Sequence, residues 1–169
     1  MKTEICNTCG GAATVTRRDY ITRDLGIPVK FQNIELIECP DCGSVEPVIP
    51  NMNGLMLTLA TAIVCSPQKL DGEEVRFLRK YVGKSAIEFS CFLHVDSTHL
   101  SKIENDRTEI GSRLDKLVRL LAANMNRELM EKSMERLMKM MPDIKDSITD
   151  EGVEIEINPE TMSCQYALA

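Results

Sequence analysis

Two stretches in the first fifty residues alternate between apolar and polar positions, with the period of a β-strand. They read Ala-Thr-Val-Thr at 13–16 and Val-Lys-Phe-Gln-Asn-Ile-Glu-Leu-Ile-Glu at 29–38. In the second stretch Phe31 falls on one face and Ile34 on the opposite face, unless the register shifts near Gln32. The pattern predicts two or three antiparallel strands within residues 1–50.

From residue 51 onward the apolar positions recur at helical spacing. Residues 51–65 carry one apolar stripe and predict a short connecting helix; its members are Leu55, Leu59, Ala62 and Ile63. Residues 70–123 are divided by glycines and capping residues into four or five short helices. Because such short helices cannot each bury a broad face alone, we expect them to pack around one another.

Local signals set the ends of these short helices. The predicted signals are a start near Gly72 and an end at Gly83, a capping box of Ser85 and Glu88, an end at His94, an N-cap at Asp96 for a helix from Ser97 to about Asn105, and a second cap-plus-acid pair, Ser112 and Asp115, that opens the run to Ala123.

The C-terminal third changes from a helical pattern to an alternating one. A methionine-rich stripe over 129–141 predicts a helix that stops at Pro142 and packs into the core or against a second copy. Methionine surfaces also suit a partner protein. The tail then alternates at Val153, Ile155 and Ile157, turns at 158–160, and returns over 162–168. This acidic tail is expected to be a solvated strand or hairpin, or to lie against a basic surface.

Together these patterns predict an α+β, multidomain chain. A small β-rich domain at 1–50 is followed by a linker helix at 51–69. An all-α domain occupies 70–123, and a C-terminal helix with an acidic β-like tail occupies 124–169.

Charge is unevenly distributed along the chain. The net charge is −6, and residues 142–169 alone hold one basic and seven acidic residues. Phosphate contacts depend on local charge, so an acidic tail is compatible with a DNA-binding middle.

No stretch has the composition of a membrane span or of an apolar signal core. The longest uncharged run includes Val48 to Ser66, a stretch with a proline, two asparagines, a glycine and two threonines. Seven cysteines in an unexported chain indicate metal ligands or reduced thiols rather than disulfides. We therefore expect a cytoplasmic protein of a prokaryote-like cell.

The sequence Cys-x-x-Cys-Gly occurs twice in the first fifty residues, as CNTCGG and as CPDCGS. Two such knuckles can supply four thiolates to one tetrahedral ion. With four protein ligands no coordination position stays open for water, so the site is expected to be structural. A domain of about 50 residues buries little surface, and zinc would stabilise it. The predicted ligands are Cys6, Cys9, Cys39 and Cys42.

Zinc is the favoured metal, and a rubredoxin-like iron site is the alternative. A thioredoxin-like redox pair is disfavoured because that motif opens a helix after a strand and does not occur twice. Cys65, Cys91 and Cys164 are expected to be small core residues.

The segment from Ser85 to Arg107, SAIEFSCFLHVDSTHLSKIENDR, has the proportions of a helix-turn-helix. An apolar seam of five residues would hold its two helices together, namely Phe89, Leu93, Val95, Leu100 and Ile103. Short polar groups and one cation then face outward and suit base edges and phosphates. The candidate DNA contacts are Ser85, Ser97, Thr98, His99, Ser101, Lys102 and Arg107. An ordinary small helical domain with a polar face shows the same periodicity.

LSKIENDR resembles the recognition helix of Xre/Cro-type repressors. Two CxxCG knuckles ahead of this helix-turn-helix resemble the YgiT/MqsA family of zinc-ribbon antitoxins and regulators, over residues 1 to about 123. The resemblance implies zinc at the four cysteines, a lambda-repressor-like helical domain, and a homodimer that reads a palindromic operator. It also implies that Thr98 and Lys102 take the places of base-contacting Asn and Arg.

The sequence departs from the family pattern at several positions. Thr98 and Lys102 are shorter or less bidentate than Asn and Arg, so a different operator is expected. Ala86 replaces a frequent phosphate-contacting Gln. His94 and Asp106 stand where Gly is common, and both residue types tolerate a positive φ comparatively well.

These observations favour a dimeric, sequence-specific DNA-binding regulator with a structural zinc ion and an antitoxin-like role. The alternative is a protein-binding module whose zinc domain masks a toxin, with DNA binding secondary. An enzyme is not expected, because the only histidines, His94 and His99, fall within the helix-turn-helix and no phosphate loop or open metal site is present.

Overall fold

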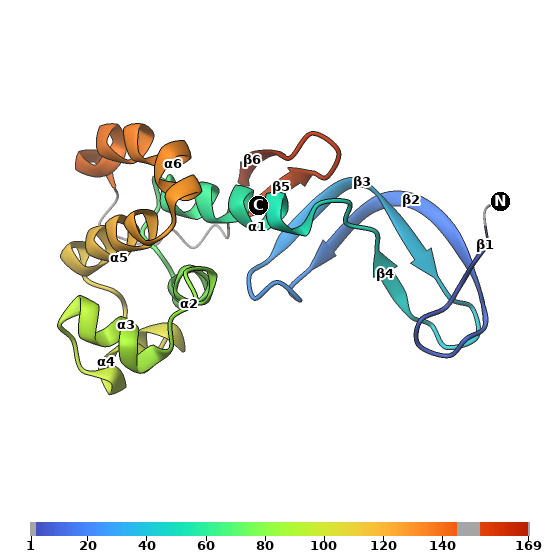
Figure 1. Cartoon of the computed structure of the whole chain (residues 1–169), viewed down its shortest axis with the longest axis horizontal. Coiled ribbons are helices and arrows are strands. Elements are labelled where there is room, and N and C mark those ends of the chain that lie inside the picture. The colour runs from blue at the N-terminus through green and yellow to red at the C-terminus, as the bar shows by residue number, and fades with distance from the viewer. Residues whose placement is uncertain (1–2, 145–152, 169) are drawn as a thin grey trace.

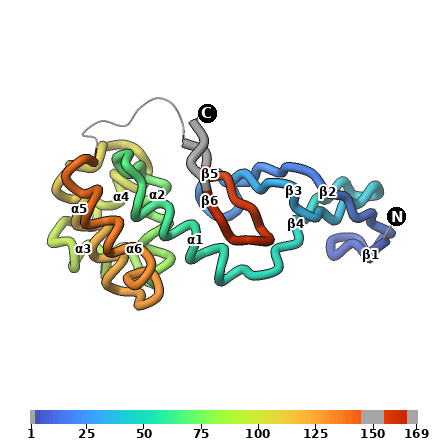
Figure 2. The backbone as a smooth tube through the Cα atoms, turned by 90° about the horizontal axis from the view of Figure 1, so that it is seen from above, coloured from blue at the N-terminus to red at the C-terminus, as the bar shows by residue number. Residues whose placement is uncertain are grey.

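A computed structural model describes residues 3–144 and 153–168 and shows a two-part α+β arrangement (Figure 1). A β-sheet forms one end of an elongated molecule, and a helical region forms the other. Helix α1 leads from the sheet into the helices, and the chain returns to the sheet through its last strands (Figure 2).

The sheet has strands β1 (Thr3–Ile5), β2 (Ala12–Thr22), β3 (Val29–Glu38), β4 (Val45–Pro47), β5 (Val153–Asn158) and β6 (Ser163–Leu168). The helices are α1 (Met52–Val64), α2 (Gly72–Tyr81), α3 (Ala86–Leu93), α4 (Ser97–Glu104), α5 (Ser112–Met125) and α6 (Arg127–Met140), with a 3-10 turn at Met141–Asp143. None of the helices in the described ranges is long and apolar enough to cross a membrane.

The long antiparallel pair of β2 and β3 is the centre of the sheet. On the other edge of β3, the short strand β4 pairs with the end near the cysteines, and β5 pairs in parallel with the opposite end. The sheet is therefore completed by residues from both ends of the sequence.

A bulge divides the β2–β3 pair. Tyr20 pairs with Phe31, whereas Arg18 pairs with Ile34, so β3 has one extra residue. Asn33 adopts a φ of 49°, and its N–H donates to Asp19 Oδ1 at 2.9 Å. The extra residue changes the phase of the strand, so Phe31 and Ile34 belong to the same core. The predicted register shift near Gln32 is present, and the opposite-face assignment was wrong for that reason.

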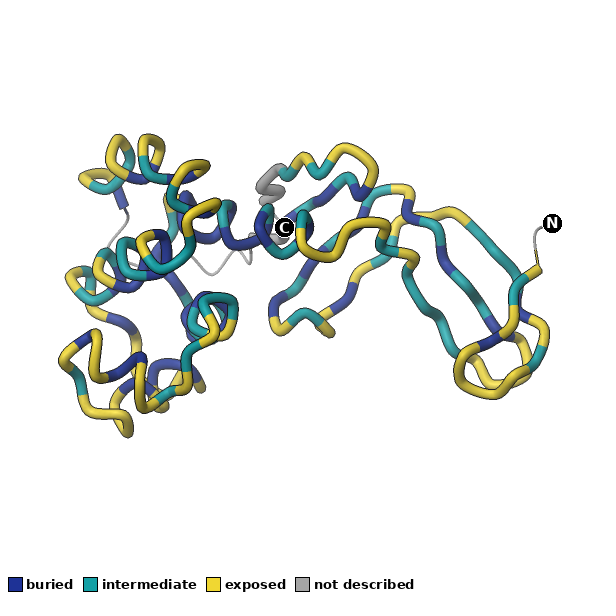
Figure 3. Tube along the Cα trace, viewed as in Figure 1, coloured by how far each residue is buried: buried dark blue, intermediate teal, exposed yellow. Residues whose placement is uncertain are grey.

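Helix α1 is a core element rather than an exposed connection. Asn51 caps it by accepting the Gly54 N–H at 2.8 Å. Seven of its residues are buried, among them Leu55, Leu59 and Ile63. Since they join β3 and the later helices in one hydrophobic cluster, the two parts of the molecule share a core (Figure 3).

The turns of the helical region follow the capping signals closely. Ser85 and Glu88 form a reciprocal capping box, and the Asp96 carboxylate accepts the Thr98 N–H at 2.7 Å. His94 and Asp106, which stand where glycine is common in the family pattern, both have a positive φ of 52°.

The prediction that Ser112 caps α5 was wrong. Gly111 is the N-cap of α5 and makes no side-chain capping bond, so Ser112 is already inside the helix. Asp115 is fully buried and pairs with Arg119 instead of capping.

Arg119 is fully buried and joins α5 to the end of α1. Its guanidinium donates to Asp115 Oδ1 at 2.8 Å. It also donates to four carbonyl oxygens in and after the last turn of α1, those of Ile63 (3.1 Å), Val64 (3.1 Å), Ser66 (2.7 Å) and Gln68 (2.5 Å). Asp115 Oδ2 accepts the Leu70 N–H at 2.7 Å, so both charges are fully engaged.

The acidic C-terminal hairpin lies against basic residues of the sheet. Glu156 of β5 accepts from Lys30 Nζ at 2.5 Å and from Gln32 Nε2 at 2.8 Å. Ile155 and Ile157, on either side of it, are buried in the main core. The hairpin is thus held by apolar burial as well as by charge.

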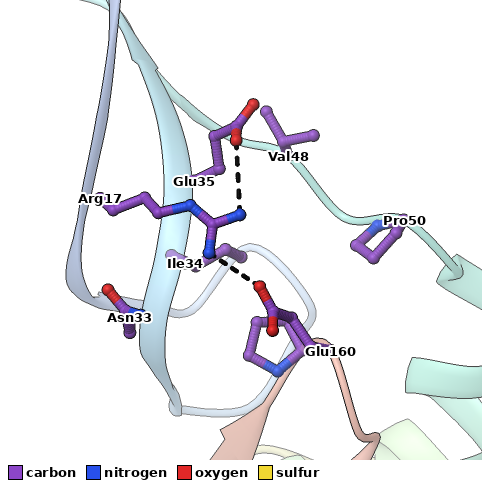
Figure 4. A pocket seen from close by; sticks show the side chains of 8 residues that line it. Arg17, Asn33, Ile34, Glu35, Val48, Pro50 and Glu160 are labelled. Atoms are coloured by element: carbon purple, nitrogen blue, oxygen red, sulfur yellow. Dashed lines mark hydrogen bonds and ion pairs between the residues drawn. The ribbon is translucent and has the colours of Figure 1, made fainter.

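A cavity of about 270 Å³ lies at the seam between this hairpin and the segment that leads into α1. Arg17 of β2 spans it, with ion pairs of 2.7 Å to Glu160 and 3.6 Å to Glu35 (Figure 4). The hydrogen bond that Arg17 donates to Glu160 raises the pKa of Arg17. Because two carboxylates already neutralise this guanidinium, the cavity offers no free cation to an anionic ligand. Its ion pairs instead connect the hairpin to the rest of the sheet.

We predict that Arg119→Met lowers the free energy of unfolding by about 3–5 kcal/mol, because it leaves Asp115 charged, buried and unpaired. Urea denaturation followed by circular dichroism measures the change. Arg127→Met is the matched control, since the Arg127 side chain is 87% exposed, and it should change stability by less than about 0.5 kcal/mol. A small effect of Arg119→Met would contradict the role given to this residue.

We predict that Lys30→Glu and Glu156→Lys each destabilise the hairpin, and that the double reversal restores most of the loss. Proteolysis of the hairpin in native protein is a direct measurement. Equal damage in the double variant would show that the pair does not hold the hairpin.

The same pair predicts a pH dependence. Hydrogen bonding from Lys30 lowers the pKa of Glu156 below its ordinary 4.5 in the folded chain. Its contribution is therefore present above that ordinary value and is lost as the pH falls through the folded pKa. Hairpin protection should decline in acid for the native chain, and less so for Glu156→Gln.

Candidate metal centre and helix-turn-helix face

The two cysteine knuckles have the same backbone geometry. In one, the Cys6 N–H donates to Gly11 O at 2.9 Å and the Gly10 N–H donates to Cys6 O at 2.9 Å. In the other, Cys39 and Gly43 make the equivalent bonds, at 3.0 and 2.9 Å, to Ser44 O and Cys39 O. Gly10 and Gly43 have φ values of 76° and 73°, where a side chain would be strained. This explains the glycine after the second cysteine of each knuckle.

The knuckles bring four sulfur atoms together at the end of the sheet farthest from the helices (Figure 1). Cys6 Sγ lies 3.6 Å from Cys42 Sγ, and Cys9 Sγ lies 3.5 Å from Cys39 Sγ. All four ligand atoms lie within 4.8 Å of one another. A regular tetrahedron with metal–sulfur bonds of about 2.3 Å has sulfur–sulfur edges of roughly 3.8 Å. The cluster can therefore hold a metal ion such as zinc.

Hydrogen-bond donors surround the sulfur atoms. The Thr8 N–H points at Cys6 Sγ and the Gly11 N–H at Cys9 Sγ, each at 3.4 Å. The Ser44 hydroxyl, followed by a backbone N–H, lowers the pKa of Cys6 to about 6 and also lowers that of Cys42.

Not all four thiols can ionise easily without a cation. The Gly11 N–H lowers the pKa of Cys9, but the three neighbouring cysteines together outweigh it and raise the value to about 12. A bound dication removes this conflict, because it stabilises every thiolate at once.

The cluster stands apart from the main core. Cys6, Ala13 and Cys39 form a separate small cluster with Ile37 packed against it. Ile5 in the adjacent strand β1 is 74% exposed. Since so little apolar surface is buried here, the end of the sheet depends on what the cysteines bind.

The remaining cysteines are not all alike. Cys65 is buried and its thiol donates to Ser133 O at 3.7 Å, while Cys164 is half-buried. Cys91 is exposed on α3, so its assignment to the core was wrong. It follows Ser90, which is buried, and helical spacing within so short an element did not separate the two faces.

Helices α3 and α4 form a compact helix-turn-helix. The turn closes through bonds from the His94 N–H to Cys91 O at 3.2 Å and from the Val95 N–H to Ser90 O at 3.1 Å. The seam predicted from the sequence is present, with four buried residues and half-buried Val95; the buried ones are Phe89, Leu93, Leu100 and Ile103.

All seven candidate DNA contacts are exposed in the structure. Five lie on the exposed side of α4, namely Ser97, Thr98, His99, Ser101 and Lys102. Ser85 lies at the start of α3, where its hydroxyl is already used in the capping box. Arg107 follows α4, and its N–H donates to Lys102 O at 2.9 Å.

The end of α4 is anchored to α2 by an ion pair that periodicity could not reveal. Arg79 donates to both carboxylate oxygens of buried Glu104, at 2.6 and 2.9 Å. This bond raises the pKa of Arg79. Arg76 donates to Glu104 O and, at 2.9 Å, to Asn105 Oδ1. The exposed polar face of α4 is thus presented by a rigidly held helix.

Comparisons with models of known protein families, with curated proteins and with solved structures found no match.

We predict that purified protein carries about one metal ion per chain at the four cysteines, and that Cys39→Ser abolishes it. Metal analysis by mass spectrometry measures the content. Cys65→Ser is the matched control and should keep the metal, because Cys65 lies far along the chain in the other core.

We predict that chelation unfolds only the end of the sheet that holds the cysteines. Amide hydrogen exchange should rise over residues 3–16 and 36–47, and residues 29–31, paired with β5, should stay protected. Cooperative loss of protection in α2 to α5 would show instead that the metal supports the whole fold.

Proposed function

We propose that this chain is a DNA-binding transcriptional regulator that reads an operator through α4 and carries a structural zinc ion. The observation behind the proposal is the face of α4, with five exposed polar or cationic side chains on one helix that is fixed from behind by Arg79 and Glu104. Short donors and acceptors with one cation suit the edges of bases in a major groove.

Charge around the helix supports this assignment. Lys102 lies in the last turn of α4 and Arg107 follows the helix. Arg113 is exposed at the start of α5. The excess negative charge of the sequence lies beyond residue 141, and its best-placed members, Glu156 and Glu160, are neutralised by the sheet. These two carboxylates therefore add little negative charge against an approach of DNA to α4.

The cysteine cluster fits a structural zinc site better than a catalytic metal site. All four ligands are thiolate sulfurs from the protein, which leaves no position for water or substrate. When bound, the ion would supply charge and cross-linking to Cys6, Cys9, Cys39 and Cys42. Iron with four thiolates is the competing occupant, and the metal analysis above distinguishes the two.

A homodimer and a palindromic operator complete the proposal, in keeping with the resemblance to YgiT/MqsA-type regulators. Two copies of α4 would enter successive major grooves about 34 Å apart. The same resemblance also suggests that the regulator acts as an antitoxin.

The second candidate is a protein-binding module that acts through the sheet. Within residues 3–144 and 153–168, strand β1 pairs only with β2, over three residues, and it presents the exposed side chain of Ile5. Such an edge can accept a strand from a partner such as a toxin. Ile5→Asp should then abolish co-purification with the product of a neighbouring short reading frame, while DNA binding stays intact.

We predict a sequence-specific gel shift with DNA from upstream of the protein's own gene, weakened by about 1–3 kcal/mol in Lys102→Ala. Lys132→Ala, on the exposed side of α6, is the matched control and should bind as the native chain does. Absence of a specific shift at moderate salt would refute the proposed function, and an unchanged affinity would remove Lys102 from the reading face.

A further inference from the structure

A second cavity, of about 220 Å³, lies between the turn that joins β2 to β3 and helices α1 and α2. Its lining combines apolar side chains with charged ones and consists of Asp24, Leu25, Gly26, Met56, Arg76, Phe77, Lys80 and Tyr81. It therefore lies where the sheet meets α2, the helix that precedes the helix-turn-helix of α3 and α4.

The floor of this cavity is apolar and is formed by packed side chains. Phe77 is buried and lies parallel to Tyr81, with ring centroids 6.3 Å apart. Leu25 and Met56 are half-buried and line the same space from the turn and from α1. These groups would exclude water from an apolar ligand.

The rim differs from that of the Arg17 cavity in its charge. There, two carboxylates already meet the cation. Here Lys80 is exposed and forms no ion pair in the described part of the chain. Arg76 lies 3.8 Å from the Glu104 carboxylate and makes its hydrogen bonds to a carbonyl and an amide oxygen instead. Asp24 is the single acidic residue of the lining. An anionic group can thus be received between two cations of one helix face.

Arg76 also touches the DNA-reading helix. Its guanidinium donates to Glu104 O and to Asn105 Oδ1, both at the end of α4. An anion in the cavity would compete for the same donors. Occupancy of the cavity and the seating of α4 are therefore coupled through one side chain.

We propose that this cavity binds a small apolar carboxylate as an effector, with its chain on Phe77, Leu25 and Met56 and its carboxylate on Lys80 and Arg76. The volume is below the ~300–1,000 Å³ typical of pockets for drug-sized ligands, which suits a ligand of roughly six to ten heavy atoms. Binding draws Arg76 from the end of α4 and weakens DNA binding; this second part rests on the proposed function.

Titration calorimetry with hexanoate tests the site without DNA. Hexanoate should bind saturably, and the uncharged hexanamide should bind at least about 10-fold more weakly, because it lacks the charge-assisted bonds. Lys80→Gln should weaken hexanoate by about 10-fold, and Met56→Trp should abolish binding by filling the cavity. Lys132→Gln is the matched control and should bind normally. No saturable binding, or binding indifferent to both Lys80→Gln and Met56→Trp, overturns the site.

Gel shifts at saturating hexanoate test the coupling. DNA affinity should fall by about 5–10-fold. Arg76→Gln should bind DNA as the hexanoate-saturated native chain does and should respond no further. An unchanged affinity of the native chain, or a full response in Arg76→Gln, overturns the coupling. If the chain fails to bind DNA at all, the proposed function falls, and calorimetry still decides the site.

Discussion

The buried pair of Arg119 and Asp115 is the interaction on which the arrangement of this protein depends. One guanidinium satisfies carbonyl oxygens in and after the last turn of α1, and its carboxylate partner holds the backbone where α2 is about to begin. Without it, several buried backbone groups and one buried charge would lack partners. The pair fixes the path of the chain from the sheet into the helices, and burial of both side chains shields it from salt.

The rest of the molecule is organised around this junction. Helix α1 gives one side to the sheet and another to α5 and α6, so a single hydrophobic cluster runs through both parts. The C-terminal hairpin closes the arrangement from the outside, through buried isoleucines and the pairs of Lys30 with Glu156 and Arg17 with Glu160. Among the described residues, the cysteine end of the sheet lies outside this core. We therefore expect its stability to depend on a metal ion bound by the four cysteines.

Features encoded over short distances could be predicted from the sequence. The doubled knuckle was sufficient to predict that these four cysteines come together, because two tight turns with a glycine have few geometries. The capping box at Ser85 and the left-handed residues His94 and Asp106 were equally local. Each of these signals occupies a few consecutive residues, where backbone geometry leaves little choice.

Features that depend on distant residues could not be predicted. The spacing of Asp115 and Arg119 is that of an ordinary exposed helical pair, and only the packing of α1 over it reveals its burial. The bulge at Asn33 reverses the inward face of β3; the sequence allowed a register shift near Gln32, but only the pairing with β2 shows that it occurs. The parallel pairing of Val29 with Ile155 joins segments from opposite ends of the chain, and no local period encodes it. Likewise, Glu104 is recognisable as an anchor only once α2 is seen beside it.

The parallel pairing of β5 with β3 also has a consequence for biosynthesis. During translation β3 emerges more than a hundred residues before its partner, so the edge of Val29 and Phe31 stays unpaired until β5 has left the ribosome. An unpaired apolar strand edge is a site for association with other chains. The order of the elements therefore ties the completion of the sheet to the synthesis of β5, and a chain terminated before residue 153 would expose the edge that β5 covers.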